Sequence, residues 1–300
     1  MSTLELRSIR KCYDQFVAVD ALSFEIAPGQ VYGLLGPNGA GKTSSIRMMI
    51  GITLPDSGEV MMFGEPFRRE HLKRVGYLPE ERGLYRKMKL QEHLVLLGEL
   101  KGLSKNEALK RTNSWCERLE LADRLDKKVE ELSKGMQQKV QFIGALLHDP
   151  DLIIMDEPFS GLDPSNAVVL KDVLLELKRA GKSILFSTHR MEQAERLCDS
   201  ICLVSHGKAV LEGQLAQIKA GYGHRNVQLQ YDGKDGFLND PALVESKNDY
   251  GNYVEVRLRP EADPQDLLKL VAGRTRITRF EIMEPSLEEI FIEVVGKVDA

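Results

Sequence analysis

The sequence predicts an α/β fold through about residue 215, followed by a small α+β domain. Three short, continuous apolar runs have the length of strands that are buried on both faces of a parallel sheet: residues 31–35, 152–155 and 183–186. Helical patterns alternate with these runs, as is typical of α/β proteins. A glycine-containing stretch, residues 220–225, interrupts the pattern and indicates a linker. We therefore expect two domains, residues 1–220 and residues 221–300.

The stretch from about residue 85 to 148 is mainly helical in pattern, and we expect it to form a helical subdomain within the α/β domain. Capping-box spacing marks two helix starts, at Ser104 with Glu107 and at Ser286 with Glu289. In the C-terminal domain, alternating apolar residues predict strands, and 3.6-residue periodicity predicts helices. The expected strands are 227–231, 254–258 and 278–282, and the expected helices are 264–272 and 286–295.

Composition limits the classes of function. The 300 residues include 41 Lys and Arg against 45 Asp and Glu, so a general nucleic-acid binder, which usually has a basic excess, is not expected. The acidity resides in residues 221–300, which carry 10 basic and 15 acidic residues. No apolar run approaches the roughly 20 residues of a membrane-spanning helix, and the N-terminus has no signal-peptide core. The four scattered cysteines are typical of reduced thiols in a cytosolic protein.

A glycine-rich loop lies between the apolar run 31–35 and a helical pattern, and it fits G-x-x-x-x-G-K-[ST]. Its glycines let backbone N–H groups turn onto phosphate oxygens, and the following helix adds its dipole. Lys42 is placed to reach the β- and γ-phosphates, and the Thr43 hydroxyl to ligate Mg²⁺. The loop predicts a nucleotide site made by Gly36, Pro37, Asn38, Gly39, Ala40, Gly41, Lys42, Thr43 and the adjoining Ser44.

Polar side chains follow the two other apolar runs. Asp156 and Glu157 come directly after the run 152–155, and His189 comes shortly after the run 183–186. Carboxyl ends of parallel strands meet at the edge of a sheet where ligands bind. We expect Asp156 to hold Mg²⁺, Glu157 to act as general base toward the attacking water, and His189 to contact the γ-phosphate and orient that water.

These residues, in this order, resemble the ABC-type ATPases, the nucleotide-binding subunits of ATP-binding-cassette systems. The resemblance covers about residues 4–215 and rests on five ordered motifs: Gly36–Thr43, Leu132–Gln137, Asp156–Glu157, Ser160–Asp163 and His189. It implies the P-loop NTPase fold of an ABC cassette, with ATP as substrate, Mg²⁺ as cofactor and ATP hydrolysis as the reaction.

The resemblance also implies an assembly. Two such cassettes, identical or similar, pair head to tail and enclose two ATP molecules. Ser133 and Gly135 of the signature would then reach the γ-phosphate across the interface, and Asp163 would belong to the loop that couples the two sites. Tyr13 matches the aromatic residue that stacks on adenine. The expected partner is a separate transmembrane permease, which places this chain on the cytoplasmic face of the membrane.

Two features depart from the commonest family pattern. The signature reads LSKGM, with Lys134 and Met136 as variants, while Ser133 and Gly135 remain. Glu80 stands where the family usually has a glutamine that links Mg²⁺ and the attacking water to the helical subdomain. A carboxylate can also ligate Mg²⁺. We therefore count Glu80 among the expected metal ligands and expect it to change the Mg²⁺ dependence of hydrolysis.

The segments PEERGLY (79–85) and EPSLEEIFIEVVG, with the small C-terminal domain, resemble a bacterial subgroup that serves two-component exporters, including sodium-efflux-type systems. Two other functions compete with that of an exporter ATPase. A soluble ABC ATPase acting on ribosomes or DNA resembles two cassettes in one chain or a cassette split by a coiled coil, and neither pattern is present. A non-hydrolysing regulatory protein is disfavoured because Lys42, Asp156, Glu157 and His189 are all retained.

Overall fold

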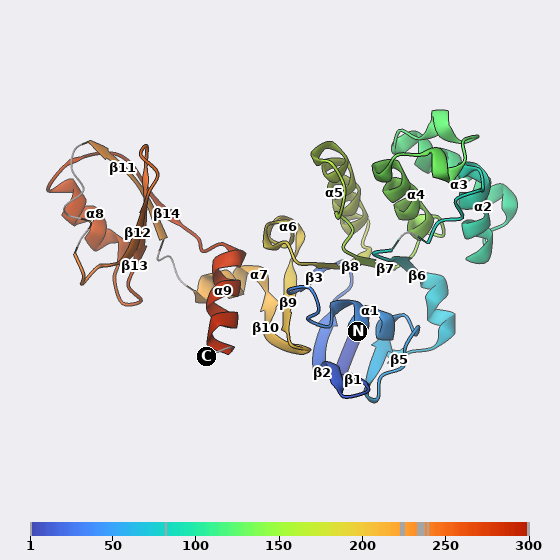
Figure 1. Cartoon of the computed structure of the whole chain (residues 1–300), viewed down its shortest axis with the longest axis horizontal. Helices are drawn as coiled ribbons and strands as arrows, with labels where there is room; N and C mark the ends of the chain where they lie inside the picture. The colour runs from blue at the N-terminus through green and yellow to red at the C-terminus, as the bar shows by residue number, and fades with distance from the viewer. Residues whose placement is uncertain (1, 82, 223–225, 233–237, 239, 299–300) are drawn as a thin grey trace. The chain divides into compact units, whose positions relative to one another are not determined.

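The computed structural model describes residues 2–81, 83–222, 226–232, 238 and 240–298 (Figure 1). Contacts divide the chain into two compact units, Met1–Gly213 and Gln214–Ala300. The sequence placed the boundary seven residues later, because the helical stretch before the linker carries no signal of the unit to which it belongs. Within the described residues, no helix is both long enough and apolar enough to cross a membrane.

The first unit is built on a six-stranded sheet with the order β10-β9-β3-β8-β7-β6. Its inner strands β9, β3, β8, β7 and the edge strand β6 run parallel, as expected for the three apolar runs. Every residue of β3, β7 and β8 is buried, which explains their continuous apolar character. The six strands are β3 (Val31–Leu35), β6 (Val75–Leu78), β7 (Leu152–Asp156), β8 (Ser183–Thr188), β9 (Ser200–Ser205) and β10 (Lys208–Gln214).

A second, antiparallel sheet packs in the same unit, with the order β2-β1-β4-β5. This sheet was not among the expected elements, because its strands alternate buried apolar with exposed polar residues and contain bulges. Its buried side chains join those of β3 and α1 in one hydrophobic core. The four strands are β1 (Leu4–Tyr13), β2 (Phe16–Ile26), β4 (Ser57–Met62) and β5 (Glu65–Pro66).

Three helices follow strands of the parallel sheet: α1 (Lys42–Met49), α5 (Pro164–Arg179) and α6 (Met191–Leu197). The expected helical subdomain contains α2 (Leu90–Leu100), α3 (Lys105–Arg118) and α4 (Lys134–Leu146), and short 3₁₀ turns lie at Arg69–Arg74, Ala122–Arg124 and Val129–Glu131. The Ser104 hydroxyl caps α3 by accepting the Glu107 N–H at 3.2 Å. The Glu107 carboxylate accepts a hydrogen bond from Arg111 at 2.6 Å rather than from the Ser104 backbone N–H. The second hydrogen bond of the predicted capping box is therefore replaced by an ion pair.

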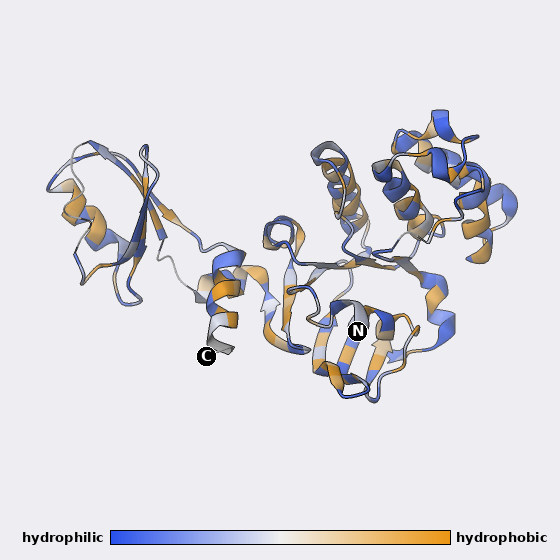
Figure 2. Cartoon of the chain, viewed as in Figure 1, coloured by the Kyte–Doolittle hydropathy of each residue, from blue (hydrophilic) through white to orange (hydrophobic). Residues whose placement is uncertain are grey.

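The second unit contains an antiparallel sheet with the order β12-β13-β11-β14. The helix α8 packs against β14, and the buried apolar residues of β11, β13 and α8 form a separate core, visible as orange bands in Figure 2. The three expected strands and both expected helices are present; β12 was missed because its sequence, VESKND, is polar. The elements are α7 (Leu215–Gly221), β11 (Asn226–Asp232), β12 (Val244–Asp249), β13 (Val254–Leu258), α8 (Pro264–Ala272), β14 (Arg276–Met283) and α9 (Leu287–Val298).

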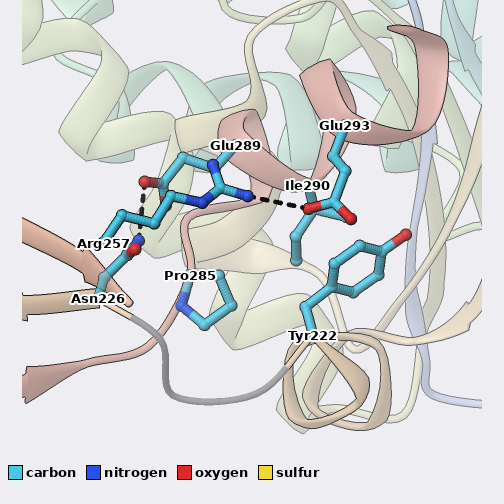
Figure 3. A pocket seen from close by; sticks show the side chains of 7 residues that line it. All are labelled: Tyr222, Asn226, Arg257, Pro285, Glu289, Ile290 and Glu293. Atoms are coloured by element: carbon cyan, nitrogen blue, oxygen red, sulfur yellow. Dashed lines mark hydrogen bonds and ion pairs between the residues drawn. The ribbon is translucent and has the colours of Figure 1, made fainter. Parts of the chain in front are cut away.

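Polar contacts attach α9 to this sheet (Figure 3). Arg257 of β13 donates to Glu293 at 3.1 Å, and Asn226 of β11 donates to Glu289 at 2.8 Å. Glu289 also completes the predicted capping box with Ser286. The pocket between these side chains measures about 20 Å³, so it has room for about one water molecule rather than for a larger ligand.

Candidate active site

The glycine-rich loop runs from the end of β3 to the first turn of α1. At two positions its backbone conformation and close neighbours allow only glycine. Gly36 and Gly41 have φ angles of +149° and +104°. A Cβ atom would lie 2.2 Å from the Val204 carbonyl oxygen at Gly36, and 2.3 Å from the Ala18 carbonyl oxygen at Gly41. Neighbouring backbone therefore touches the loop on two sides, and any side chain at these positions would force the loop out of place.

Lys42 lies at the start of α1 and is only 6% exposed. Its ammonium donates to the carbonyl oxygens of Gly36 at 2.7 Å and Pro37 at 3.0 Å, so it lies across the loop. Burial lowers the pKa of Lys42, while the carboxylates of Glu157, Asp156 and Glu80 act in the opposite direction. A buried cation facing three carboxylates is what a site for a phosphate chain and a divalent cation requires.

A cavity of about 380 Å³ brings most of the expected site residues together. Gly36, Pro37 and Ala40 belong to the loop without lining the cavity. Phe16 and Ala18 line it but were not predicted. Phe16 pairs with Tyr13 at the turn between β1 and β2, and that hairpin, which sequence reasoning missed, is what carries it to the site. The cavity is lined by Tyr13, Phe16, Ala18, Asn38, Gly39, Gly41, Lys42, Thr43, Ser44, Glu80, Asp156 and Glu157.

Asp156, at the end of β7, is 1% exposed. Its Oδ1 accepts a short hydrogen bond from the Ser187 hydroxyl, while its Oδ2 has no hydrogen-bond partner among the described residues. A buried carboxylate oxygen without a partner is costly unless a cation or water completes it. Thr43 and Glu80 line the same cavity with further oxygen atoms. These hard oxygen donors fit Mg²⁺.

Glu157 and His189 form a coupled pair at the ends of β7 and β8. The Oε1 atom of Glu157 accepts from the His189 backbone N–H at 3.0 Å and lies 2.8 Å from His189 Nδ1. An ionised Glu157 accepts both bonds, which requires the imidazole proton on Nδ1. Glu157 is 9% exposed and has a φ of +50°, a conformation that costs a non-glycine residue about 1–3 kcal/mol. Such strain concentrates at functional sites.

Ser133, Gly135 and Asp163 lie together, but they do not line this cavity. The Ser133 hydroxyl caps α4, and the Asp163 carboxylate caps α5 by accepting from the Asn166 backbone at 2.9 Å. This backbone hydrogen bond is the main cause that lowers the pKa of Asp163. A Cβ atom at Gly135 would lie 3.2 Å from Asn166 Nδ2 and 3.8 Å from Asp163 Oδ2, so the starts of α4 and α5 are neighbours.

Two family models match the chain. One, described as ABC transporter, matches residues 19–160, and the other, described as ATP-binding protein DrrA1-3-like, C-terminal domain, matches residues 213–295. Among solved structures, the ATP-binding subunit of an ABC transporter has a TM-score of 0.69 and 34% identity over 74% of this chain and 94% of that chain. The cassette fold and the C-terminal domain are thus both shared with known proteins.

Curated relatives align along the whole chain. An uncharacterized ABC transporter ATP-binding protein of Bacillus subtilis is 44% identical over 98% of this chain and 99% of its own length. A Nod factor export ATP-binding protein I of Cupriavidus metallidurans is 36% identical over 98% of this chain and 97% of its own length. With these matches, the resemblance noted in the sequence is confirmed: the chain belongs to the ATP-binding proteins of ABC transporters, the cassette family that binds and hydrolyses ATP.

Proposed function

We propose that the chain powers an exporter, by ATP-driven pairing of two cassettes that act on a separate membrane permease from the cytoplasmic face. The observation that carries this proposal is the convergence of Lys42, Asp156 and Glu157 around one cavity, with His189, which does not line the cavity, in contact with Glu157. Export is supported by the likeness to the Nod factor export protein of Cupriavidus metallidurans. The transported substrate follows from none of these residues.

Within one chain, the residues of the site fall into two groups, which supports the pairing. The loop, Asp156 and Glu157 surround the cavity, whereas Ser133 and Gly135 lie at the start of α4 beside Asp163. Head-to-tail pairing would place Ser133 and Gly135 of one cassette against the nucleotide held by the other. The positive end of α4 would then face the γ-phosphate, where a helix N-terminus favours negative charge.

Each group in the cavity has a role in this proposal. Tyr13 stacks on adenine, and the backbone of Gly36–Ser44 with Lys42 holds the phosphates. Thr43, Asp156 and Glu80 hold Mg²⁺, which would neutralise charge on the phosphate oxygens. Glu157 takes a proton from the attacking water. His189 holds Glu157 through the 2.8 Å contact and, in this proposal, contacts the γ-phosphate.

The test is Glu157→Gln, which keeps the shape of the side chain but removes its basicity. We expect ATP binding to persist and turnover to fall at least about 100-fold, the usual worth of a positioned general base. ATP should lower the dimer dissociation constant of the variant, measured by light scattering at a series of protein concentrations with and without ATP. Glu92→Gln, at an exposed glutamate on α2, is the control and should behave as wild type. A Glu157→Gln protein whose dimer dissociation constant is the same with and without ATP, and which turns over normally, would contradict the proposal.

A further inference from the structure

The sheet of the second unit has two edges of different character. At one edge, β12 carries Glu245, Lys247 and Asp249, and charged residues on an edge strand discourage pairing with another chain. At the other edge lies β14, whose eight residues pair with β11 on one side only. Among the residues that the structure describes, no strand pairs with its outer side. β14 therefore presents a row of unpaired backbone groups.

The outer strand is regular over most of its length. The pairing of β14 with β11 shifts register only near Ile277, so 279–283 continue as a flat ladder. Ile282 and Met283 are 39% and 38% exposed, although both are large apolar residues. A regular edge with exposed apolar side chains is a template for another strand, and natural proteins rarely leave one uncovered.

The two faces of β14 differ in chemistry. Phe280 and Ile282 lie opposite Leu229 and Val227 of β11, on the face that carries the buried core. Arg279 and Glu281 lie opposite Gln230 and Gln228, on the polar face. Arg279 and Glu281 form an ion pair with each other, and their side chains are 50% and 45% exposed. In the regular stretch 279–283, one positive and one negative charge thus lie one residue to each side of Phe280, while Arg276 lies beyond the register shift.

We propose that β14 pairs with β14 of a second copy of this chain, antiparallel, with the two-fold axis passing at Phe280. In this register Arg279 lies opposite Glu281 of the second copy, and Glu281 lies opposite Arg279. Ile282 then lies opposite Thr278, the extra residue where the pairing of β14 with β11 shifts register, so the regular part of the new ladder is centred on residues 279–281. Directly opposed residues with opposite charges stabilise a strand pair, so the edge is complementary to itself.

Neighbouring registers lack this complementarity. If the axis passed at Arg279, the two arginines would oppose each other; if it passed at Glu281, the two glutamates would. Like charges directly opposite one another are destabilising. A slip of a single residue would turn the apolar face of one strand to the polar face of the other. One register therefore fits both the charges and the faces.

The same geometry explains why the pairing would stop at two copies. Joining β14 to β14 produces one continuous sheet of eight strands, whose outer strands are the two charged β12 edges. A two-fold contact of this kind uses the same patch on both copies and is closed. A second copy of the chain is thus the occupant that fits this edge, without a site for a third.

The first experiment reverses the charges in the full-length protein and measures the dimer dissociation constant without nucleotide, by sedimentation equilibrium. Arg279→Glu and Glu281→Arg should each weaken the dimer at least tenfold, because each change turns two attractive pairs of the interface into repulsive ones. The double swap, Arg279→Glu with Glu281→Arg, should restore the constant to within about threefold of wild type. Lys269→Glu, a charge reversal at an exposed residue on α8, is the control and should leave the dissociation constant unchanged.

The second experiment tests the register by disulfide formation. Phe280→Cys should cross-link two copies under mild oxidation, because residue 280 lies on the axis opposite its own copy, and opposed residues of antiparallel strands lie within disulfide range. Ile282→Cys should not, since residue 282 does not face itself in this register. Wild type controls for the native thiols, of which Cys116, Cys198 and Cys202 are buried.

The outcomes separate this proposal from the pairing of cassettes around ATP. A wild-type chain that is monomeric without nucleotide, or single reversals that leave the constant unchanged, would overturn the β14 pairing. A dimer that forms only with ATP and ignores the charge of Arg279 would also overturn it while supporting the cassette pairing. A nucleotide-free dimer that responds to Arg279 would stand even if the Glu157→Gln test failed.

Discussion

Three acidic residues line the ATP cavity, and the two that are expected to hold Mg²⁺, Asp156 and Glu80, differ in burial. Asp156 is buried with one oxygen bound by Ser187 and the other without a hydrogen-bond partner, whereas Glu80 is exposed at the cavity wall. Asp156 is therefore fixed in place before any cation arrives, and Glu80 can move. A mobile carboxylate attracts Mg²⁺ to the site but also repels the phosphates. Glu80 should thus change the Mg²⁺ requirement more than it changes ATP binding.

Glu80→Gln removes one negative charge from the cavity and tests whether Glu80 sets the Mg²⁺ requirement. We expect the Mg²⁺ concentration for half-maximal ATPase activity to rise at least about threefold, equivalent to ~0.6 kcal/mol, because the glutamine no longer attracts the cation. The measurement is an Mg²⁺ titration of turnover at fixed ATP. Glu81→Gln, the adjacent residue outside the cavity lining, is the matched control. Superimposable titrations for Glu80→Gln and wild type would remove Glu80 from the metal site.

Among the elements, the turn between β9 and β10 supports the phosphate-binding loop through hydrogen bonds and packing; we call this contact the Gly207 brace. The Gly207 N–H donates to the Ala40 carbonyl at 3.0 Å, and the Gly207 carbonyl accepts from the Asp20 N–H at 2.8 Å. Gly207 has a φ of +78°, and a Cβ atom there would lie 2.9 Å from the Ala18 carbonyl oxygen. The same carbonyl also limits Gly41. The turn, β2 and the loop therefore form one packed unit.

Gly207→Ala should loosen this unit and raise the dissociation constant for ATP about tenfold, measured with a fluorescent nucleotide. Gly181→Ala is the matched control, because its φ of +84° imposes the same backbone strain while its Cβ atom would meet nothing within 4 Å. Gly181→Ala should lose about 1 kcal/mol of stability in a denaturant titration, and Gly207→Ala should lose more because its Cβ atom also meets the Ala18 carbonyl. Equal loss of nucleotide affinity in the two variants would show that strain alone, and not the brace, is responsible.

Which elements the sequence could predict follows from how each one is buried. The strands β3, β7 and β8 are buried on both faces and therefore appear as continuous apolar runs, so their ends at Asp156 and His189 could be placed. β1 and β12 each expose one face, so they mix polar with apolar residues and show no continuous apolar run by which to predict them. Phe16 reached the cavity through the unpredicted β1–β2 hairpin. The brace by Gly207 is a contact between distant segments, which no local pattern encodes.

For the whole molecule, the division into two units implies that the ATP site does not depend on the C-terminal residues. All cavity residues belong to Met1–Gly213, while the acidic character belongs to the second unit. The unit boundary lies before α7, whose Leu215 and Ile218 are buried. A chain that keeps α7 but loses the rest of its unit would expose these two side chains to water.

Two truncations test this division. A chain ending at Gln214 should bind ATP within about twofold of the full-length protein, and it should stay monomeric without nucleotide because β14 is gone. A chain ending at Gly221 should bind ATP equally well but aggregate at lower protein concentration, owing to the uncovered apolar face of α7. Light scattering and nucleotide titration measure both properties, and a thermal melt verifies that each truncation is folded. Loss of ATP binding in a folded Gln214 truncation would contradict the independence of the site.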